Sequence, residues 1–201
     1  MNMPLRDKLS THPSVRSDLT GSKVVLRAPE PSDLPFLVTW SSDPEIRALT
    51  AETEPLTRRT APGYLRTVRK DRNRLWYVIV DRETGRPVGE CGLLRIFWPW
   101  KTADLTMIIG EKEYWGRGFA DEAMGLLLEL AFTDLGLHRL AVGVLETNGR
   151  ALKFYSRHGF REEGRQREGH FRKGRYHDFV MMSLLKGDCG KRRRYPGRNV
   201  K

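Results

Sequence analysis

Two glycines, Gly116 and Gly118, bracket Arg117, and a stretch with helical periodicity follows at once. Glycine lets the backbone approach a ligand closely and adopt conformations that other residues avoid. The first amides of a helix have no partner inside the helix, and together with the helix dipole they attract anions. Arg117 adds a cation beside them. The segment therefore predicts a turn that binds a phosphorylated ligand.

Two common phosphate-binding motifs do not fit this turn. A Walker loop requires Gly-Lys-Ser/Thr before its helix, and this segment lacks it. A dinucleotide-binding turn has a third Gly or Ala where this chain carries Asp121, whose negative charge suits a pyrophosphate poorly. By themselves, the two glycines do not distinguish a phosphate site from a simple tight turn.

A second candidate segment lies downstream, at residues 148–160. Asn148 is of a residue type that caps helices, and Gly159 is of a type that ends them. Tyr155 lies seven residues after Asn148, so both face the same side of the predicted helix. By spacing alone, the pair is consistent with a helix cap and an ordinary tyrosine at the edge of a core.

The elements that must position these segments form an antiparallel meander and then a strand–helix–strand–helix–strand order. Residue types and periodicity predict strands at 23–27, 75–80, 88–97, 103–110, 138–146, 160–168 and 175–185, and helices at 32–41, 61–70, 120–131 and 148–157. Ser32 or Asp33 is expected to cap the first helix, and Gly85 to turn a hairpin. The helix at 120–131 has the apolar spacing of a deeply buried element.

Residues 113–123 resemble motif A of the GNAT acetyltransferase superfamily, whose pattern is Gln/Arg-x-x-Gly-x-Gly/Ala. Gly118 and Ala120 match its last two fixed positions, while Trp115 stands where Gln or Arg is usual. This departure shifts the expected phosphate contacts from a side chain to the backbone amides. The resemblance is strongest to the branch that contains the ribosomal-protein N-acetyltransferases and many small-molecule amine acetyltransferases.

Residues 148–160 resemble motif B of the same superfamily, and residues 174–178 resemble the closing hairpin of that branch. The resemblance covers residues 23–186, which implies one acyltransferase domain between a flexible arm at 1–22 and a basic tail at 187–201. It also implies the fold: an α/β architecture with a mixed, mostly antiparallel central sheet and helices on both faces.

The resemblance implies acetyl-CoA, or another acyl-CoA, as the co-substrate. Its pantetheine arm is expected to pair with a strand, and its pyrophosphate to lie on the glycine turn. The residues expected to bind it are Thr106, Met107, Ile108, Ile109, Gly116, Arg117, Gly118, Phe119, Ala120 and Asn148.

The implied reaction is the direct attack of an amine on a thioester, which requires a neutral amine and a proton for the leaving thiolate. Tyr155 matches the usual general acid of the family, and Asp104 lies where several members place a carboxylate base. Other sources of a base remain open: Glu90, His170, His177 or bulk water. Ala151 replaces a Ser that is often found in relatives.

The acceptor is expected to be a small-molecule amine or a protein N-terminus. In this fold the helices at 32–41 and 61–70 usually form a wall of the acceptor site. Acidic residues in and after the first of them suggest a cationic amine, such as a polyamine or an aminoglycoside-like compound. The acidic residues are Asp43, Glu45, Glu52 and Glu54, and Trp40 lies in the same stretch.

The net charge of +11 favours an anionic partner. Six Lys and Arg residues crowd the last residues of the tail, which reads either as a solvated segment or as a contact for nucleic acid or an acidic protein. Two alternatives to an acyl-CoA-dependent transferase remain open. In the first, the donor is an acyl-carrier protein or an aminoacyl-tRNA. In the second, the chain is an acyl-CoA-binding module without catalysis.

The composition limits the class of protein. With 201 residues, of which 39% are hydrophobic, the chain fits one globular domain with tails. No apolar run is long enough to suggest a membrane helix, and the histidines and cysteines lack metal-ligand spacing. Two cysteines do not make a disulfide framework, which indicates a reducing, cytoplasmic environment. Both a monomer and a homodimer are open.

Overall fold

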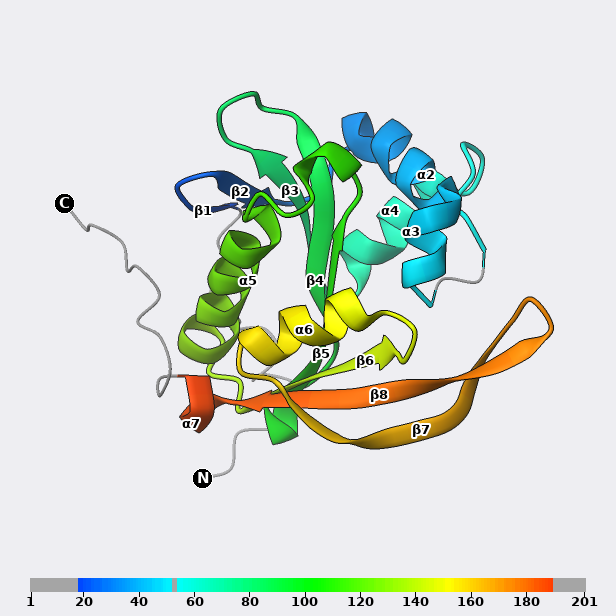
Figure 1. Ribbon diagram of the computed structural model, residues 1–201. Coiled ribbons are helices and arrows are strands. Elements are labelled where there is room, and N and C mark those ends of the chain that lie inside the picture. Colours follow the sequence, from blue (N-terminus) through cyan, green and yellow to red (C-terminus); the bar gives the residue numbers. More distant parts are fainter. Residues whose placement is uncertain (1–17, 52–53, 190–201) are drawn as a thin grey trace.

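The computed structural model describes residues 18–51 and 54–189, and its central feature is one eight-stranded sheet (Figure 1). Across the sheet the order is β1-β2-β3-β4-β5-β6-β8-β7, and only the β5–β6 pair is parallel. The strands are β1 (Asp18–Thr20), β2 (Val24–Arg27), β3 (Leu75–Asp81), β4 (Pro87–Phe97), β5 (Thr102–Ile109), β6 (Arg139–Leu145), β7 (Arg161–Arg172) and β8 (Arg175–Leu185). The predicted mixed, mostly antiparallel sheet is confirmed.

Helices cover both faces of this sheet (Figure 1). On one side lie α5 (Phe119–Glu129) and α6 (Gly149–Arg157), and on the other lie α2 (Leu34–Ser42), α3 (Pro44–Leu49) and α4 (Ala61–Lys70). The short α7 (Lys186–Cys189) follows β8. Among the described residues, none of these helices is long and apolar enough to cross a lipid bilayer.

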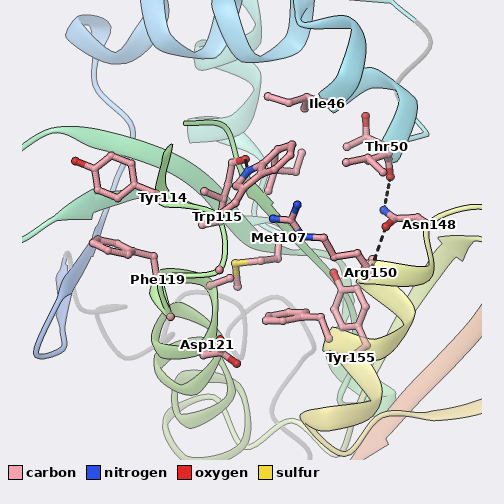
Figure 2. A pocket seen from close by; sticks show the side chains of 18 of the residues that line it. Ile46, Thr50, Met107, Tyr114, Trp115, Phe119, Asp121, Asn148, Arg150 and Tyr155 are labelled. Carbon is pink, nitrogen blue, oxygen red and sulfur yellow. Dashed lines mark hydrogen bonds between the residues drawn. The ribbon is translucent and has the colours of Figure 1, made fainter. Parts of the chain in front are cut away.

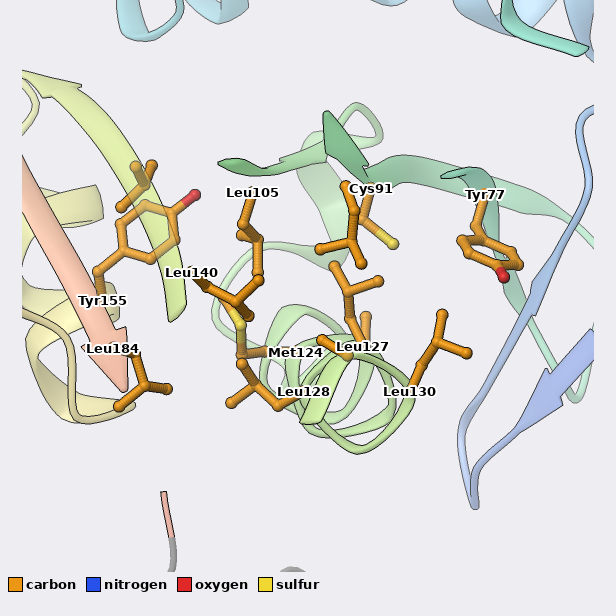
Figure 3. Packing of buried hydrophobic residues seen from close by; sticks show 14 of the residues in the cluster. Tyr77, Cys91, Leu105, Met124, Leu127, Leu128, Leu130, Leu140, Tyr155 and Leu184 are labelled. Atoms are coloured by element: carbon orange, nitrogen blue, oxygen red, sulfur yellow. The ribbon is translucent and has the colours of Figure 1, made fainter. Parts of the chain in front are cut away.

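The main core lies between α5, α6 and the sheet (Figure 3). Met124, Leu127 and Leu128 of α5 are at most 1% exposed. They belong to one cluster with Leu105 and Leu140 from the sheet, and each such side chain contributes roughly 1.5–3 kcal/mol by leaving water. A smaller cluster on the opposite face packs α2 and α3 against β5 and the glycine turn; it consists of Leu37, Trp40 and Ile46, with Ile108 and Trp115 beside them.

The parallel strands β5 and β6 diverge toward their carboxyl ends. Their pairing begins at Thr102 with Arg139 and ends at Asp104 with Ala141, although β5 continues to Ile109. Beyond Asp104, β5 pairs only with β4 among the described strands. The divergence leaves a gap in the sheet, with one edge of β5 open toward it.

The flexible arm predicted at residues 1–22 ends earlier than expected, because a strand begins at Asp18. Asp18–Thr20 forms an edge strand on β2, because Leu19 turns inward and is only 3% exposed. Residues 1–17 lie outside the described residues. Of the predicted tail, residues 187–189 belong to α7, and residues 190–201 are likewise outside the described part.

Two details near the first helices also differ from the prediction. Asp33 is the N-cap residue of α2 as predicted, but its side chain makes no capping hydrogen bond to that helix; its carboxylate instead accepts hydrogen bonds from Arg27 (2.7 Å) and from the amide of Glu30 (2.7 Å). The sequence also did not predict α3. Asp43 caps that helix by accepting from the amides of Glu45 and Ile46, and the helix was missed because it is so short.

Candidate active site

The glycine turn has the conformation that its sequence predicts. Gly116 and Gly118 have φ angles of +74° and +85°, which L side chains rarely adopt. The first backbone hydrogen bond of α5 is donated by the amide of Glu122 to the carbonyl of Gly118 (3.1 Å). The amides of Phe119 and Ala120 therefore precede any intrahelical partner, and they form a cradle for an anion at the start of the helix.

Trp115, the departure from the superfamily pattern, anchors this turn. Its indole N–H donates to the carbonyl of Ile109 at the end of β5 (2.8 Å). The guanidinium of Arg150, from the first turn of α6, lies 4.1 Å from the centroid of the Trp115 ring (Figure 2). The tryptophan thus connects the turn to β5 on one side and to α6 on the other.

A cavity of about 280 Å³, called here the donor cavity, lies between the glycine turn, the end of β5 and α6 (Figure 2). Eight of the predicted cofactor residues line it: Met107, Ile108, Ile109, Gly116, Gly118, Phe119, Ala120 and Asn148. Thr106 and Arg117 do not. Thr106 faces a second cavity, and the Arg117 guanidinium lies over the rings of Tyr114 and Phe119. The structure therefore brings together most, but not all, of the predicted set.

The negative charge of Asp121, which suits a pyrophosphate poorly, is offset by neighbouring side chains of α6. Its carboxylate accepts a hydrogen bond from Arg157 (2.7 Å) and lies 3.4 Å from Nε2 of His158. Both partners come from the end of α6, so this contact also joins α6 to the start of α5. The paired carboxylate repels an anion in the donor cavity less than a free one would.

Asn148 caps α6 as predicted. Its side-chain oxygen accepts from the amide of Ala151 (3.0 Å), and its Nδ2 donates to the carbonyl of Leu49 at the end of α3 (2.8 Å). One amide hydrogen and one lone pair are left over. The residue therefore joins α6 to α3, and its contact with a cofactor stays a prediction.

A second cavity of about 380 Å³, called here the acceptor cavity, opens on the other face of the sheet. Its walls include Trp76 of β3, Leu94 of β4, Phe179 of β8 and Ala51, which follows α3. It meets the donor cavity at the gap between β5 and β6. The residues that line both cavities are Leu49, Thr50, Met107, Ile108, Asn148, Ala151 and Tyr155.

Tyr155 lies where the two cavities meet, and it is 5% exposed. Its ring packs edge-on against Phe154 and Phe160, at 5.3 and 5.4 Å between centroids. Its hydroxyl makes no hydrogen bond with residues 18–51 or 54–189. Burial raises the pKa of the Tyr155 phenol above its ordinary value, so the group keeps its proton and can donate it.

Asp104 lines the acceptor cavity but already has a partner. Its carboxylate accepts a hydrogen bond from Nε of Arg95, whose side chain is 80% exposed. Glu90 pairs in register with Ile108, so it lies on the same face of the sheet, and its carboxylate accepts from the indole of Trp76 (2.7 Å). The structure therefore offers two carboxylates on this face, and the choice of base stays a prediction.

The two histidine candidates lie elsewhere. His170 is buried on β7 behind Phe179, with 6.0 Å between ring centroids, and it lines neither cavity. His177 lies 3.8 Å from Glu146, whereas Asp178 accepts from the amide of Glu168. Neither imidazole is placed beside Tyr155.

The acidic residues that the sequence assigned to the acceptor do not line the acceptor cavity, so their role stays a prediction. Neither α2 nor α4 lines the acceptor cavity. Asp43 and Glu45 lie 2.9 and 2.8 Å from Nζ of Lys112, and this contact holds the pKa of Asp43 below its usual value. Trp40 is buried and donates to Glu111 (2.7 Å). Glu54 lines no cavity described above, and Glu52 is outside the described residues.

Two lining residues were missed by sequence reasoning. Arg150 is a cation in the first turn of a helix, where the dipole disfavours positive charge, and this could have marked it as functional. Thr50 gave no signal in the sequence. Its hydroxyl is buried without a partner among the described residues, and it lines both cavities. Among those residues, no group of three or more His, Cys, Asp or Glu could hold a metal ion.

Comparisons with known proteins agree with this geometry. Residues 23–161 match the model of the acetyltransferase (GNAT) domain. An uncharacterized N-acetyltransferase, p20, from Bacillus licheniformis is 30% identical over 82% of this chain and 93% of its own length. The spermidine N(1)-acetyltransferase of Vibrio cholerae is 30% identical over 82% of this chain and 94% of its own. A crystal structure of the spermidine N-acetyltransferase from Vibrio cholerae, in complex with CoA and spermine, superposes with a TM-score of 0.78 at 28% identity, over 84% of this chain and 99% of that one.

Proposed function

This chain belongs to the GNAT family of acetyltransferases, and from that premise we propose that it transfers an acetyl group from acetyl-CoA to a primary amine by direct attack. The observation that carries the proposal is the meeting of two cavities at Tyr155. One cavity has an anion cradle and a strand edge, and the other opens on the opposite face of the sheet. Two substrates that enter from opposite faces would meet at this phenol.

In the donor cavity, the free amides at the start of α5 would hold the pyrophosphate, with Arg150 beside them. The open edge of β5 near Met107 and Ile109 would pair with the amides of the pantetheine arm, as a further strand does. Bound there, acetyl-CoA supplies a thioester at the gap between β5 and β6. The fit rests on two sets of backbone groups: the amides that follow the positive-φ glycines at the start of α5, and the edge of β5 that its divergence from β6 leaves open.

In the reaction, the amine nitrogen attacks the carbonyl carbon and the carbon–sulfur bond breaks. Tyr155 donates its phenolic proton to the leaving sulfur, since burial keeps the phenol protonated. The incoming ammonium group must lose one proton before it attacks, which Asp104 takes through a water molecule, and the proton that the nitrogen loses after the attack restores the Tyr155 phenol. Because Arg95 already holds Asp104, this carboxylate is expected to be a modest base whose larger effect is to attract the incoming ammonium group.

The acceptor class is a small amine or a protein N-terminus. Similarity to spermidine acetyltransferases supports a small amine, whereas the resemblance of residues 113–123 to the ribosomal-protein branch supports an N-terminus. Spermidine is a polycation, and Asp104 is the only carboxylate that lines the acceptor cavity among the described residues. On this ground we favour an amine with one positive charge over a polyamine.

The experiment is an assay of thiol release from acetyl-CoA with a panel of amines: spermidine, an arylalkylamine and a peptide with a free N-terminus. Intact mass of the product identifies the acetylated nitrogen. We expect turnover that requires the amine, with a higher kcat/KM for the arylalkylamine than for spermidine. Donor binding without turnover on any amine would support the alternative of an acyl-CoA-binding module instead.

A further inference from the structure

A hollow with three cations lies on the far side of the glycine turn from the acceptor cavity. Lys23, Arg82 and Arg117 line it, and it shares Phe119 with the donor cavity. Nζ of Lys23 lies 3.3 Å from the carbonyl oxygen of Arg117 and would lie 3.7 Å from a Cβ added at Gly118. Lys23 and Arg117 therefore lie beside the turn, in a hollow that shares only Phe119 with the donor cavity.

None of these three cations forms an ion pair with a described residue. The side chain of Arg82 donates only to the carbonyl of Gly21 (3.0 Å) and the side chain of Lys23 only to that of Arg117, among the described residues, whereas nearby Arg86 is paired with two carboxylates. Converging cations repel one another unless an anion joins them, so the arrangement favours an anionic ligand.

Two acidic residues also line this hollow. The Asp81 carboxylate is buried and accepts from Thr84 (2.9 Å) and from the hydroxyl of Tyr114 (3.1 Å). Glu83 is exposed, and its amide donates to Asp81 (3.1 Å). The ligand therefore has to bind against the cationic side chains and away from these two carboxylates.

The position of Lys23 is fixed by Glu122 in the first turn of α5. The Glu122 carboxylate accepts from the amides of Ser22 (2.6 Å), Lys23 (2.7 Å) and Val24 (3.0 Å), and also from the Ser22 hydroxyl (2.5 Å). Although burial opposes its charge, these bonds lower the pKa of Glu122. One carboxylate thus ties the turn between β1 and β2 to the helix that begins at the phosphate cradle.

From this geometry we propose that Lys23, Arg82 and Arg117 form a second anion subsite, which binds a phosphate monoester, and that its occupant is the 3′-phosphate of the bound CoA. The inference rests on the proposed function for the donor, and it assigns to these side chains a group that the backbone cradle does not hold. Lys23 and Arg82 contact the phosphate, and Glu122 is a positioning residue for Lys23.

The test compares the dissociation constants of CoA and 3′-dephospho-CoA by calorimetry, for the unaltered protein, Lys23→Gln and Arg82→Gln. Lys70→Gln is the control, because Lys70 is exposed at the end of α4 and lines none of the three hollows. We expect Lys23→Gln to weaken CoA binding about tenfold, as the loss of one charge-assisted contact does. Binding of 3′-dephospho-CoA is expected to change less than about twofold, because that ligand lacks the group in question.

Equal losses for both ligands would overturn the assignment, since they would mean that Lys23 only supports the turn or contacts the pyrophosphate. Equal affinities of the two ligands for the unaltered protein would also overturn it, and would leave a free phosphate ester as the occupant; direct calorimetric binding of inorganic phosphate that Lys23→Gln abolishes would identify that case. Because calorimetry needs no turnover, a failure of the proposed transfer reaction is seen separately in the amine assay.

Discussion

The donor and acceptor cavities share Tyr155 but are built in different ways. The donor cavity is lined mainly by short segments: the end of β5, most of residues 114–121 and the helix α6, with three residues at the end of α3. Much of its chemistry comes from backbone amides that two positive-φ glycines expose. The acceptor cavity draws on five strands, on α6 and on the loop after α3; residues 104–108 of β5 and 142–145 of β6 line it together with separate side chains such as Trp76, Leu94 and Phe179.

This difference separates what the family has in common from what the individual chain determines. A backbone cradle tolerates changes of side chain as long as the turn is kept, so it serves one donor across many proteins. A cavity made of side chains changes its shape with each substitution in any of its strands. We therefore expect variants of the donor side to act through the KM for acetyl-CoA, and variants of the acceptor side through the amine.

The largest effect is expected where the two cavities meet. Tyr155→Phe removes only the hydroxyl, and kcat should fall about a hundredfold because general acid catalysis is lost. The KM for acetyl-CoA should change little. Since burial raises the pKa of Tyr155 above its ordinary value, the phenol stays protonated as pH rises, and kcat should show no alkaline decline from this group below about pH 10. Initial rates across pH provide the measurement.

Tyr77→Phe is the matched control. Tyr77 is also buried, its hydroxyl has no partner among the described residues, and burial likewise raises its pKa. It lines neither cavity, so this variant should keep its full kcat. Comparable losses in both variants would show that the effect of Tyr155 comes from packing rather than from proton transfer.

On the donor side, Gly118→Ala should raise the KM for acetyl-CoA about tenfold while kcat at saturation is kept. The alanine would be strained at a φ of +85°, which also costs about 1 kcal/mol of stability. Gly85→Ala in the β3–β4 hairpin is the control, because its φ is +72° and an added Cβ meets nothing within 4 Å. Both variants should lower the melting temperature similarly, and a rise in KM in both would refute a specific role for the turn.

The sequence predicted the local conformations on the donor side because their signals are local. Gly116, Gly118 and the Asn148 cap each act through neighbours within a few residues, so their conformations could be predicted and are confirmed. The acceptor side depends on which strands lie side by side and where β5 leaves β6, and no local pattern reports this. For that reason the ion pairs of Asp43 and Glu45 with Lys112, far along the chain, were not predicted.

The smallest effect is expected from Asp104→Asn. This variant tests whether a change in the acceptor cavity leaves the KM for acetyl-CoA unchanged. Asp104 is paired with Arg95, and such a pair near the surface adds little to stability, so the variant should fold normally. We expect kcat/KM for the amine to fall about fivefold, because one attractive charge is lost, while the KM for acetyl-CoA stays constant. Glu163→Gln is the control: Glu163 forms a similar pair with Arg139 but lines neither cavity. A loss of a hundredfold or more in kcat for Asp104→Asn would instead make Asp104 a direct base, and a rise in the donor KM would mean that the two cavities are coupled across the gap between β5 and β6.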